Sequence, residues 1–227
     1  MSTTFTLVDA LALRDLQVYL GRAARIEEGS VRLIAGGGIL AVYVAVFYPI
    51  GLLDEAPTVL GLRTFAVRDT ESFDAVVPVR SLIERINRLV DRVTDDTEPV
   101  VATLPMEVNT VTWAAISPPK GGWVTHTPTT SRVLDSVARS GIDEIAEAVP
   151  TGTGQQIVHR VRSDVWGRPI ENLEHVPAGG AFAALSLGFL GGDSQDEVRI
   201  YETGPWTRLT TDRGHVLIKR KAWSLAR

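Results

Sequence analysis

The chain of 227 residues is 44% apolar and 22% charged, and it contains no cysteine. This composition is typical of a globular protein rather than a disordered one, and the lack of cysteine excludes disulfides and thiolate metal sites. The net charge of −4 gives the protein as a whole no attraction to nucleic acid or to an anionic membrane. Because residues 1–4 lack the basic and apolar regions of a secretory signal, we expect a cytoplasmic protein.

The first part of the chain predicts a helix, a β-meander and a second helix. Leucines three and four residues apart predict an amphipathic helix over residues 9–26. Residues 33–53 carry no charge and are long enough to span a bilayer, but three glycines interrupt them. The β-branched runs on either side of those glycines, 31–35 and 39–48, instead predict a buried hairpin. The remaining elements of this part are a strand over 60–67 and a helix that begins at Pro78.

The second part of the chain begins after the polar stretch 94–99, which ends in proline and is the best candidate for a domain boundary. We therefore predict two domains, 1–95 and 96–227, with a single compact domain as the alternative. The predicted elements are strands over 100–104 and 108–116, helices over 131–148 and 178–190, and a second meander over 198–202, 206–210 and 215–220. The pattern of residues 155–166 is ambiguous and leans toward a helix. Gly141 is expected to break the first of these helices.

Strands and helices in blocks, without regular alternation, indicate an α+β fold in which two antiparallel β-meanders pack with several helices. The sequence shows no repeat of fixed period. Three stretches, AVYVAVFYPIGLLD, TVTWAAISPPKGGW and GPWTRLTTDRGHVLIKR, resemble an actinobacterial protein family with no assigned function. The resemblance covers most of the chain and implies a bacterial cytoplasmic protein, but it carries no catalytic residue over to this sequence.

The C-terminal hairpin is the first candidate for a binding surface. Residues 198–227 hold seven basic and two acidic side chains, so a basic segment follows an acidic body. The candidate residues are Trp206, Arg208, Arg213, His215 and Lys219. An arginine beside an exposed aromatic ring can hold an anionic partner or a stacked base. The alternative is a solvated edge hairpin whose charges only prevent edge-to-edge aggregation.

A loop before the first long helix of the second part is the alternative site, for a hydrolase-like enzyme acting on a small molecule. Ser117 and Lys120 match the S-x-x-K pattern of penicillin-recognising enzymes, in which the serine is the nucleophile. The two prolines between them favour an extended loop, and the companion motifs S-D-N and K-T-G are absent from the sequence. The candidate pocket comprises Trp113, Ser117, Lys120, Trp123 and His126.

We expect neither a metal nor another cofactor, because the four histidines lack the spacing of paired ligands and the glycine-rich stretches fit no phosphate-binding motif. The sequence thus favours a binding or assembly module without catalytic activity. The expected partner is an acidic protein or a second copy of the chain. Nucleic acid is possible but not supported by the net charge, and no membrane association is expected.

Overall fold

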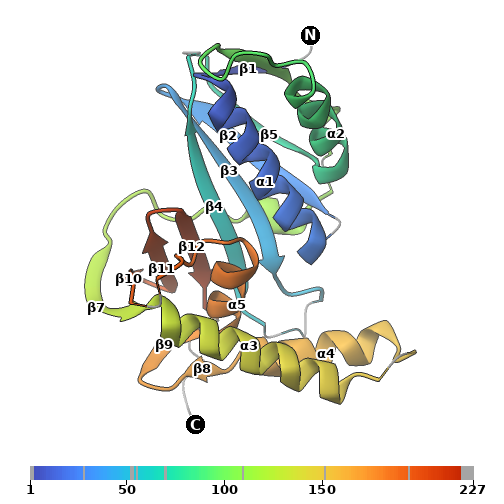
Figure 1. Ribbon diagram of the computed structural model, residues 1–227. Helices are drawn as coiled ribbons and strands as arrows, with labels where there is room; N and C mark the ends of the chain where they lie inside the picture. Colours follow the sequence, from blue (N-terminus) through green and yellow to red (C-terminus); the bar gives the residue numbers. More distant parts are fainter. Residues whose placement is uncertain are drawn as a thin grey trace. The chain divides into compact units, whose positions relative to one another are not determined.

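The computed structural model describes residues 3–27, 29–51, 54, 56–68, 71–108, 110–150, 152–193 and 195–220. The chain forms two compact units, unit 1 with residues 1–45 and 62–117 and unit 2 with residues 46–61 and 118–227. Each unit combines helices with mainly antiparallel strands, which confirms the predicted α+β class (Figure 1). The boundary placed at residue 95 from the sequence lies inside unit 1.

Unit 1 is built on strands in the order β5, β2, β3, β4. Its elements are β1 (Thr4–Leu7), α1 (Ala10–Ile26), β2 (Ser30–Gly36), β3 (Ile39–Phe47), β4 (Thr58–Ala66), β5 (Phe73–Pro78), α2 (Val79–Val90) and β6 (Val100–Thr103), with the ends of β3 and β4 assigned to unit 2. Strand β2 pairs antiparallel with β3 and with β5, and β1 pairs antiparallel with β6. Figure 1 shows α1 and α2 side by side, and the Gln17 side chain donates a hydrogen bond to Asn87 between them.

The core of unit 1 follows from two periodicities. Alternate residues of β2, among them Val31 and Leu33, are buried, as are the leucines of α1 at positions 13, 16 and 20. The side chain of Asp9 accepts a hydrogen bond from the Ala12 N–H at 2.7 Å and so starts α1 close to the predicted position.

The glycine-interrupted apolar stretch forms the predicted hairpin of β2 and β3. Gly37 and Gly38 have φ angles of 61° and 79° at its turn, a conformation that side chains with a Cβ rarely adopt. Strand β3 lies between β2 and β4, so both of its edges are paired. Within the described residues, no helix combines the length and apolar character that a membrane crossing would require.

Unit 2 contains strands in the order β4, β12, β11, β10, β7. Its remaining elements are β7 (Val124–Thr130), α3 (Ser131–Ala148), α4 (Gln155–Trp166), β8 (Pro169–Ile170), β9 (Leu173–Pro177), α5 (Ala178–Ser186), β10 (Glu197–Thr203), β11 (Trp206–Thr211) and β12 (Gly214–Lys219). Helix α5 approaches the sheet closely, because a Cβ at Gly180 would lie 2.6 Å from Cδ1 of Ile218. Unit 1 begins with a strand (β1), a helix (α1) and three strands (β2, β3 and β4). Unit 2 ends with the same order of elements, in β9, α5, β10, β11 and β12.

Three local predictions are wrong. The described part of 108–116 forms no strand but a 3-10 helix, Thr112–Ala115, in which the Ala114 carbonyl accepts a hydrogen bond from Arg32. Helix α3 continues through Gly141, since this glycine is the position at which the indole ring of Trp166 packs against the helix. Helix α5 ends at Ser186 rather than at residue 190, and the chain turns at Gly188 with a φ of 71°.

Candidate functional site

The strongest candidate for a recognition site in unit 2 is a guanidinium held between two aromatic rings. The Arg208 side chain of β11 lies 4.4 Å from the ring centroid of Tyr201 and 4.6 Å from that of Trp123. Tyr201 stands directly opposite Arg208 because β10 and β11 pair antiparallel. Trp123 precedes β7, and its Nε1 donates to the carbonyl of Pro119 at 3.2 Å. Both rings are partly exposed, so the guanidinium is positioned near the surface.

Two further basic side chains lie on the same face of the sheet. Arg199 of β10 stands opposite Thr210 of β11, which in turn stands opposite His215 of β12. The Nδ1 atom of His215 lies 3.1 Å from the Thr210 hydroxyl oxygen. The name Arg208 cluster is used below for Trp123, Arg199, Tyr201, Arg208 and His215. The cluster combines positive charge with aromatic surface on one side of three adjacent strands.

Arg208 lacks a compensating acid. Within the described residues its side chain makes no hydrogen bond or ion pair, and its Nε atom is buried without a partner. Burial lowers the pKa of Arg208, Tyr201 opposes that change, and the like charge of Arg199 adds to it. The guanidinium nevertheless stays charged at neutral pH because the ordinary pKa of arginine is above 12. An anion that reaches its free N–H groups would therefore be bound by both charge and hydrogen bonds.

His215 gives this cluster a testable response to pH. Burial, and next the nearby charges of Arg208 and Arg199, lower the pKa of His215 below its ordinary value of 6.5. The folded protein thus holds His215 neutral while the unfolded chain already binds a proton, so stability falls as pH decreases from about 6.5 toward the folded pKa. We expect His215→Gln to flatten this slope in chemical denaturation measured at several pH values. An unchanged slope in the variant would contradict this assignment.

The structure changes the interpretation of the hairpin candidates. Trp206 is only 5% exposed, so the expectation of an exposed aromatic residue at this position is wrong. Large aromatic side chains bury much apolar area, and Trp206 does so in the core. Arg213 in the β11–β12 turn and Lys219 at the end of β12 are exposed, whereas Arg208 is partly buried. Lys221 and Arg227, which contribute to the basic charge of the segment, lie outside the described residues.

Sequence reasoning assigned Trp123 to a different site and missed Tyr201. The turn at Gly204 and Pro205 offered a signal, because a two-residue turn places Thr203 opposite Trp206. Counting outward from that pair puts Tyr201 opposite Arg208. The contact with Trp123 could not be obtained in this way, since it depends on the pairing of β7 with β10.

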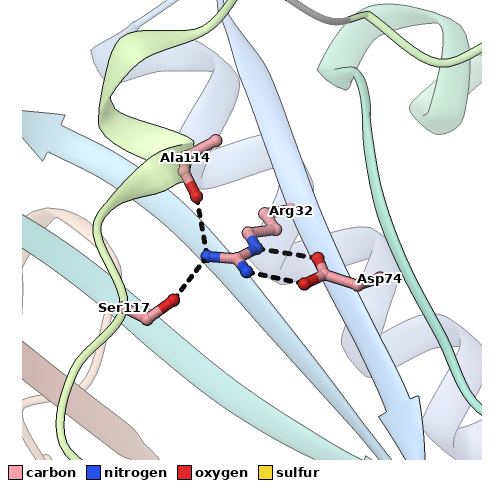
Figure 2. Close-up of polar contacts among 4 residues, drawn as sticks. All are labelled: Arg32, Asp74, Ala114 and Ser117. Atoms are coloured by element: carbon pink, nitrogen blue, oxygen red, sulfur yellow. Dashed lines mark hydrogen bonds and ion pairs between the residues drawn. The ribbon is translucent and has the colours of Figure 1, made fainter.

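The alternative pocket divides between the two units. In unit 1 Trp113 is buried, and the Ser117 hydroxyl accepts a hydrogen bond from Nη1 of Arg32 at 3.1 Å (Figure 2). The same nitrogen donates to the Ala114 carbonyl at 2.7 Å, and the other two guanidinium nitrogens bind Asp74 at 2.8 and 2.6 Å. Through these bonds Arg32 attaches the 3-10 helix and the following segment, up to Ser117, to β2. Among the hydrogen bonds of the described residues, Ser117 is an acceptor from Arg32, and none pairs it with a histidine or lysine that could act as its base.

The other members of the alternative pocket belong to unit 2, where Lys120 is exposed. Nε2 of His126 lies 3.1 Å from the Glu202 carboxylate, which also lies 3.1 Å from the Arg220 guanidinium. The hydroxyl of buried Thr207 lies 3.2 Å from Glu202 and 2.9 Å from the carbonyl of His175. A carboxylate beside a histidine can orient a catalytic base, but Thr207 is too deeply buried to serve as its nucleophile. The arrangement therefore works as a polar link between β7, β10 and β11.

Comparison with protein families gives two matches. A domain of unknown function, DUF8010, matches residues 1–109, and a second domain of unknown function, DUF8185, matches residues 118–223. The second match begins at Pro118, where unit 2 resumes. No curated protein matches the sequence.

The fold is similar to that of bacterial sliding clamps. The DNA polymerase sliding clamp of Caulobacter crescentus matches 100% of this chain over 69% of its own, with 13% identity and a TM-score of 0.51. A protein described as a DNA polymerase III beta subunit from Eubacterium rectale matches 99% of this chain over 66% of its own, with 10% identity and a TM-score of 0.53. At such low identity the likeness establishes the fold, and the chain spans about two thirds of the length of these clamps.

Proposed function

We propose that this pair of domains of unknown function is a binding module without catalytic activity, which recognises an acidic segment of a partner protein through the Arg208 cluster. The observation that carries the proposal is the guanidinium of Arg208 between the rings of Trp123 and Tyr201, with no carboxylate partner among the described residues. Tryptophan, tyrosine and arginine are the residue types most enriched at the energetic hot spots of protein interfaces, and all three meet here. The similarity to sliding clamps, which are named as polymerase subunits, supports a role in assembly.

The aromatic rings explain why such a site would bind tightly. A free arginine loses much side-chain entropy when it binds a ligand, but one stacked between two rings has lost part of that freedom already. A carboxylate of the partner can then accept two parallel N–H bonds. Arg199 and the exposed Arg213 add positive potential around this point, although Arg199 also has a loose contact of 3.5 Å with Asp212. The cluster therefore favours an acidic sequence over an isolated carboxylate.

Binding of a labelled poly-glutamate peptide, measured by fluorescence anisotropy, tests the proposal. We expect Arg208→Gln to abolish binding and Arg208→Lys to weaken it, because lysine keeps the charge but cannot bind a carboxylate through two parallel N–H bonds. Binding by the unmodified protein should weaken with salt, since screening acts within about 8 Å at physiological ionic strength. Loss of the ring contacts should cost only about 1 kcal/mol, or about 2–4 °C in melting temperature.

Arg160→Gln is the matched control, because Arg160 is exposed on α4 in the same unit and the substitution removes the same charge. If this variant weakens peptide binding as much as Arg208→Gln does, the effect belongs to net charge and the proposed site is wrong. Tighter binding of an oligothymidylate with the same net charge as the peptide would contradict the choice of a protein partner. Sedimentation at several protein concentrations shows whether the acidic segment comes from a second copy of the chain.

A further inference from the structure

Three arginines of unit 1, two on helix α2 and one just after it, lie around one small groove. Arg85 and Arg88 lie three residues apart on one face of α2, and Arg92 lies in the turn that follows the end of the helix at Val90. Together with Leu89 of α2 and with Val101 and Thr103 of β6 they line an open cavity of about 180 Å³. Among the described residues, no acidic side chain lines this groove. Although the whole protein is acidic, all three charged side chains that line the groove are positive.

The three arginines have few partners of their own. Arg88 donates from Nε to the Glu84 carbonyl at 3.1 Å, and its Nη2 lies 3.9 Å from the exposed Glu84 carboxylate. For Arg85 and Arg92 the described part of the chain provides neither an ion pair nor a side-chain hydrogen bond. All three side chains are exposed, so their donors are available to a ligand.

Helix stability does not account for this arrangement. Cations near a helix C-terminus interact favourably with its dipole, but Arg85 lies before the last turn of α2 and gains nothing from this. Arg85 and Arg88 are like-charged neighbours on α2, and such a pair destabilises a helix. Arg92 adds a third positive charge just after the helix ends. An anion bound among the three guanidinium groups would attract each of them and offset the repulsion between them.

We propose that the groove binds a phosphate group. A phosphate offers several acceptor oxygens and up to two negative charges, which three guanidinium groups can share, whereas one carboxylate occupies a single arginine. The Thr103 hydroxyl at the same groove supplies a further donor. The cavity has roughly six times the volume share of a water molecule, which suits one phosphate rather than a large ligand. The phosphate can be free in solution or part of a nucleic-acid backbone, and the experiment separates these sources.

Calorimetric titration with inorganic phosphate, at an ionic strength held constant with chloride, measures the affinity directly. We expect Arg85→Gln and Arg92→Gln each to lower the affinity about tenfold, since each loses a charge-assisted hydrogen bond. Without phosphate, Arg85→Gln should melt at the same temperature as the unmodified protein or higher, because a repulsive pair on α2 is removed. Arg92→Gln should melt at nearly the same temperature, because the side chain is exposed. Arg68→Gln is the matched control, as Arg68 is exposed in the same unit and lies outside the groove.

A labelled oligonucleotide distinguishes the sources of phosphate. If its affinity falls in the same two variants, and the slope of log K against log salt decreases by about one for each arginine removed, the groove binds a nucleic-acid backbone. If only phosphate binding falls, the ligand is a small phosphate compound. The proposal is overturned if phosphate binds no better than chloride, or if Arg68→Gln lowers its affinity as much as Arg92→Gln. Since these residues lie in unit 1, neither result depends on the Arg208 cluster.

Discussion

Replacing Val44 by aspartate is expected to abolish soluble expression. Val44 is 3% exposed in the central strand β3 and stands opposite Val31 of β2. An unpaired charge in such a dry position costs several kcal/mol, a large part of the total stability of a domain, which is about 5–15 kcal/mol. Soluble yield and circular dichroism of the recovered protein measure the effect.

The control for this prediction lies in the same strand. Ile39 is 52% exposed beside the β2–β3 turn, so Ile39→Asp introduces the same charge at a solvated position. We expect this variant to be soluble and to melt within a few degrees of the unmodified protein, because surface substitutions usually change stability by less than about 0.5 kcal/mol. Soluble, stable Val44→Asp protein would show that β3 is not buried as described.

Two glycine-to-alanine substitutions in helices are expected to act in opposite directions. Alanine normally stabilises a helix by about 0.5–1 kcal/mol relative to glycine. At Gly21 of α1 a Cβ would meet no atom within 4 Å, so Gly21→Ala should raise the melting temperature by a few degrees. At Gly141 of α3 a Cβ would overlap the buried ring of Trp166. Overpacking of this kind costs about 1–3 kcal/mol, so Gly141→Ala should lower stability despite the better helix propensity.

Chemical denaturation of both variants measures the two changes in the free energy of unfolding. The Trp166 ring lies between α3 and α5, because its other contact is a stack on Phe182 of α5 at a centroid distance of 4.5 Å. The ring therefore has no free space into which it can move, and a methyl group at position 141 would push α4 away from α3. If Gly141→Ala stabilises the protein as Gly21→Ala does, the close packing of α4 on α3 is wrong.

Elements with a strong local pattern could be predicted from the sequence. The leucines of α1 repeat at helical spacing, and the structure has this helix within one residue of its predicted start and at its predicted end. The glycines at 36–38 require a turn between two β-branched runs, so β2 and β3 follow from backbone sterics alone. The bounds of α3 and the strands of the C-terminal meander are also confirmed, since periodicity and turn residues agree along these segments. Helix α4 forms where the sequence pattern only leaned toward a helix.

Elements whose pattern is weak depended on contacts distant in sequence. Strand β7 is largely exposed, contains four threonines in seven residues and carries no apolar alternation, yet it forms because β10 offers an edge to pair with. The segment 108–116 has strand-like composition, but its described residues include a 3-10 helix whose carbonyl is bound by Arg32. Gly141 would favour a break in an isolated helix, and only the approach of Trp166 explains its presence within α3.

The candidate site, too, could be predicted from the sequence only in part. Sequence alone identified the basic hairpin and the residues Arg208 and Trp123, because charge and aromatic content are properties of composition. It also placed Trp206 at the surface and Trp123 in a different site. Only the register of β10 with β11 and the pairing of β7 with β10 set Tyr201 and Trp123 against the same guanidinium. Sequence thus determined which chemical groups are available, whereas tertiary structure decided which of them meet, because strand pairing joins residues that no local periodicity relates.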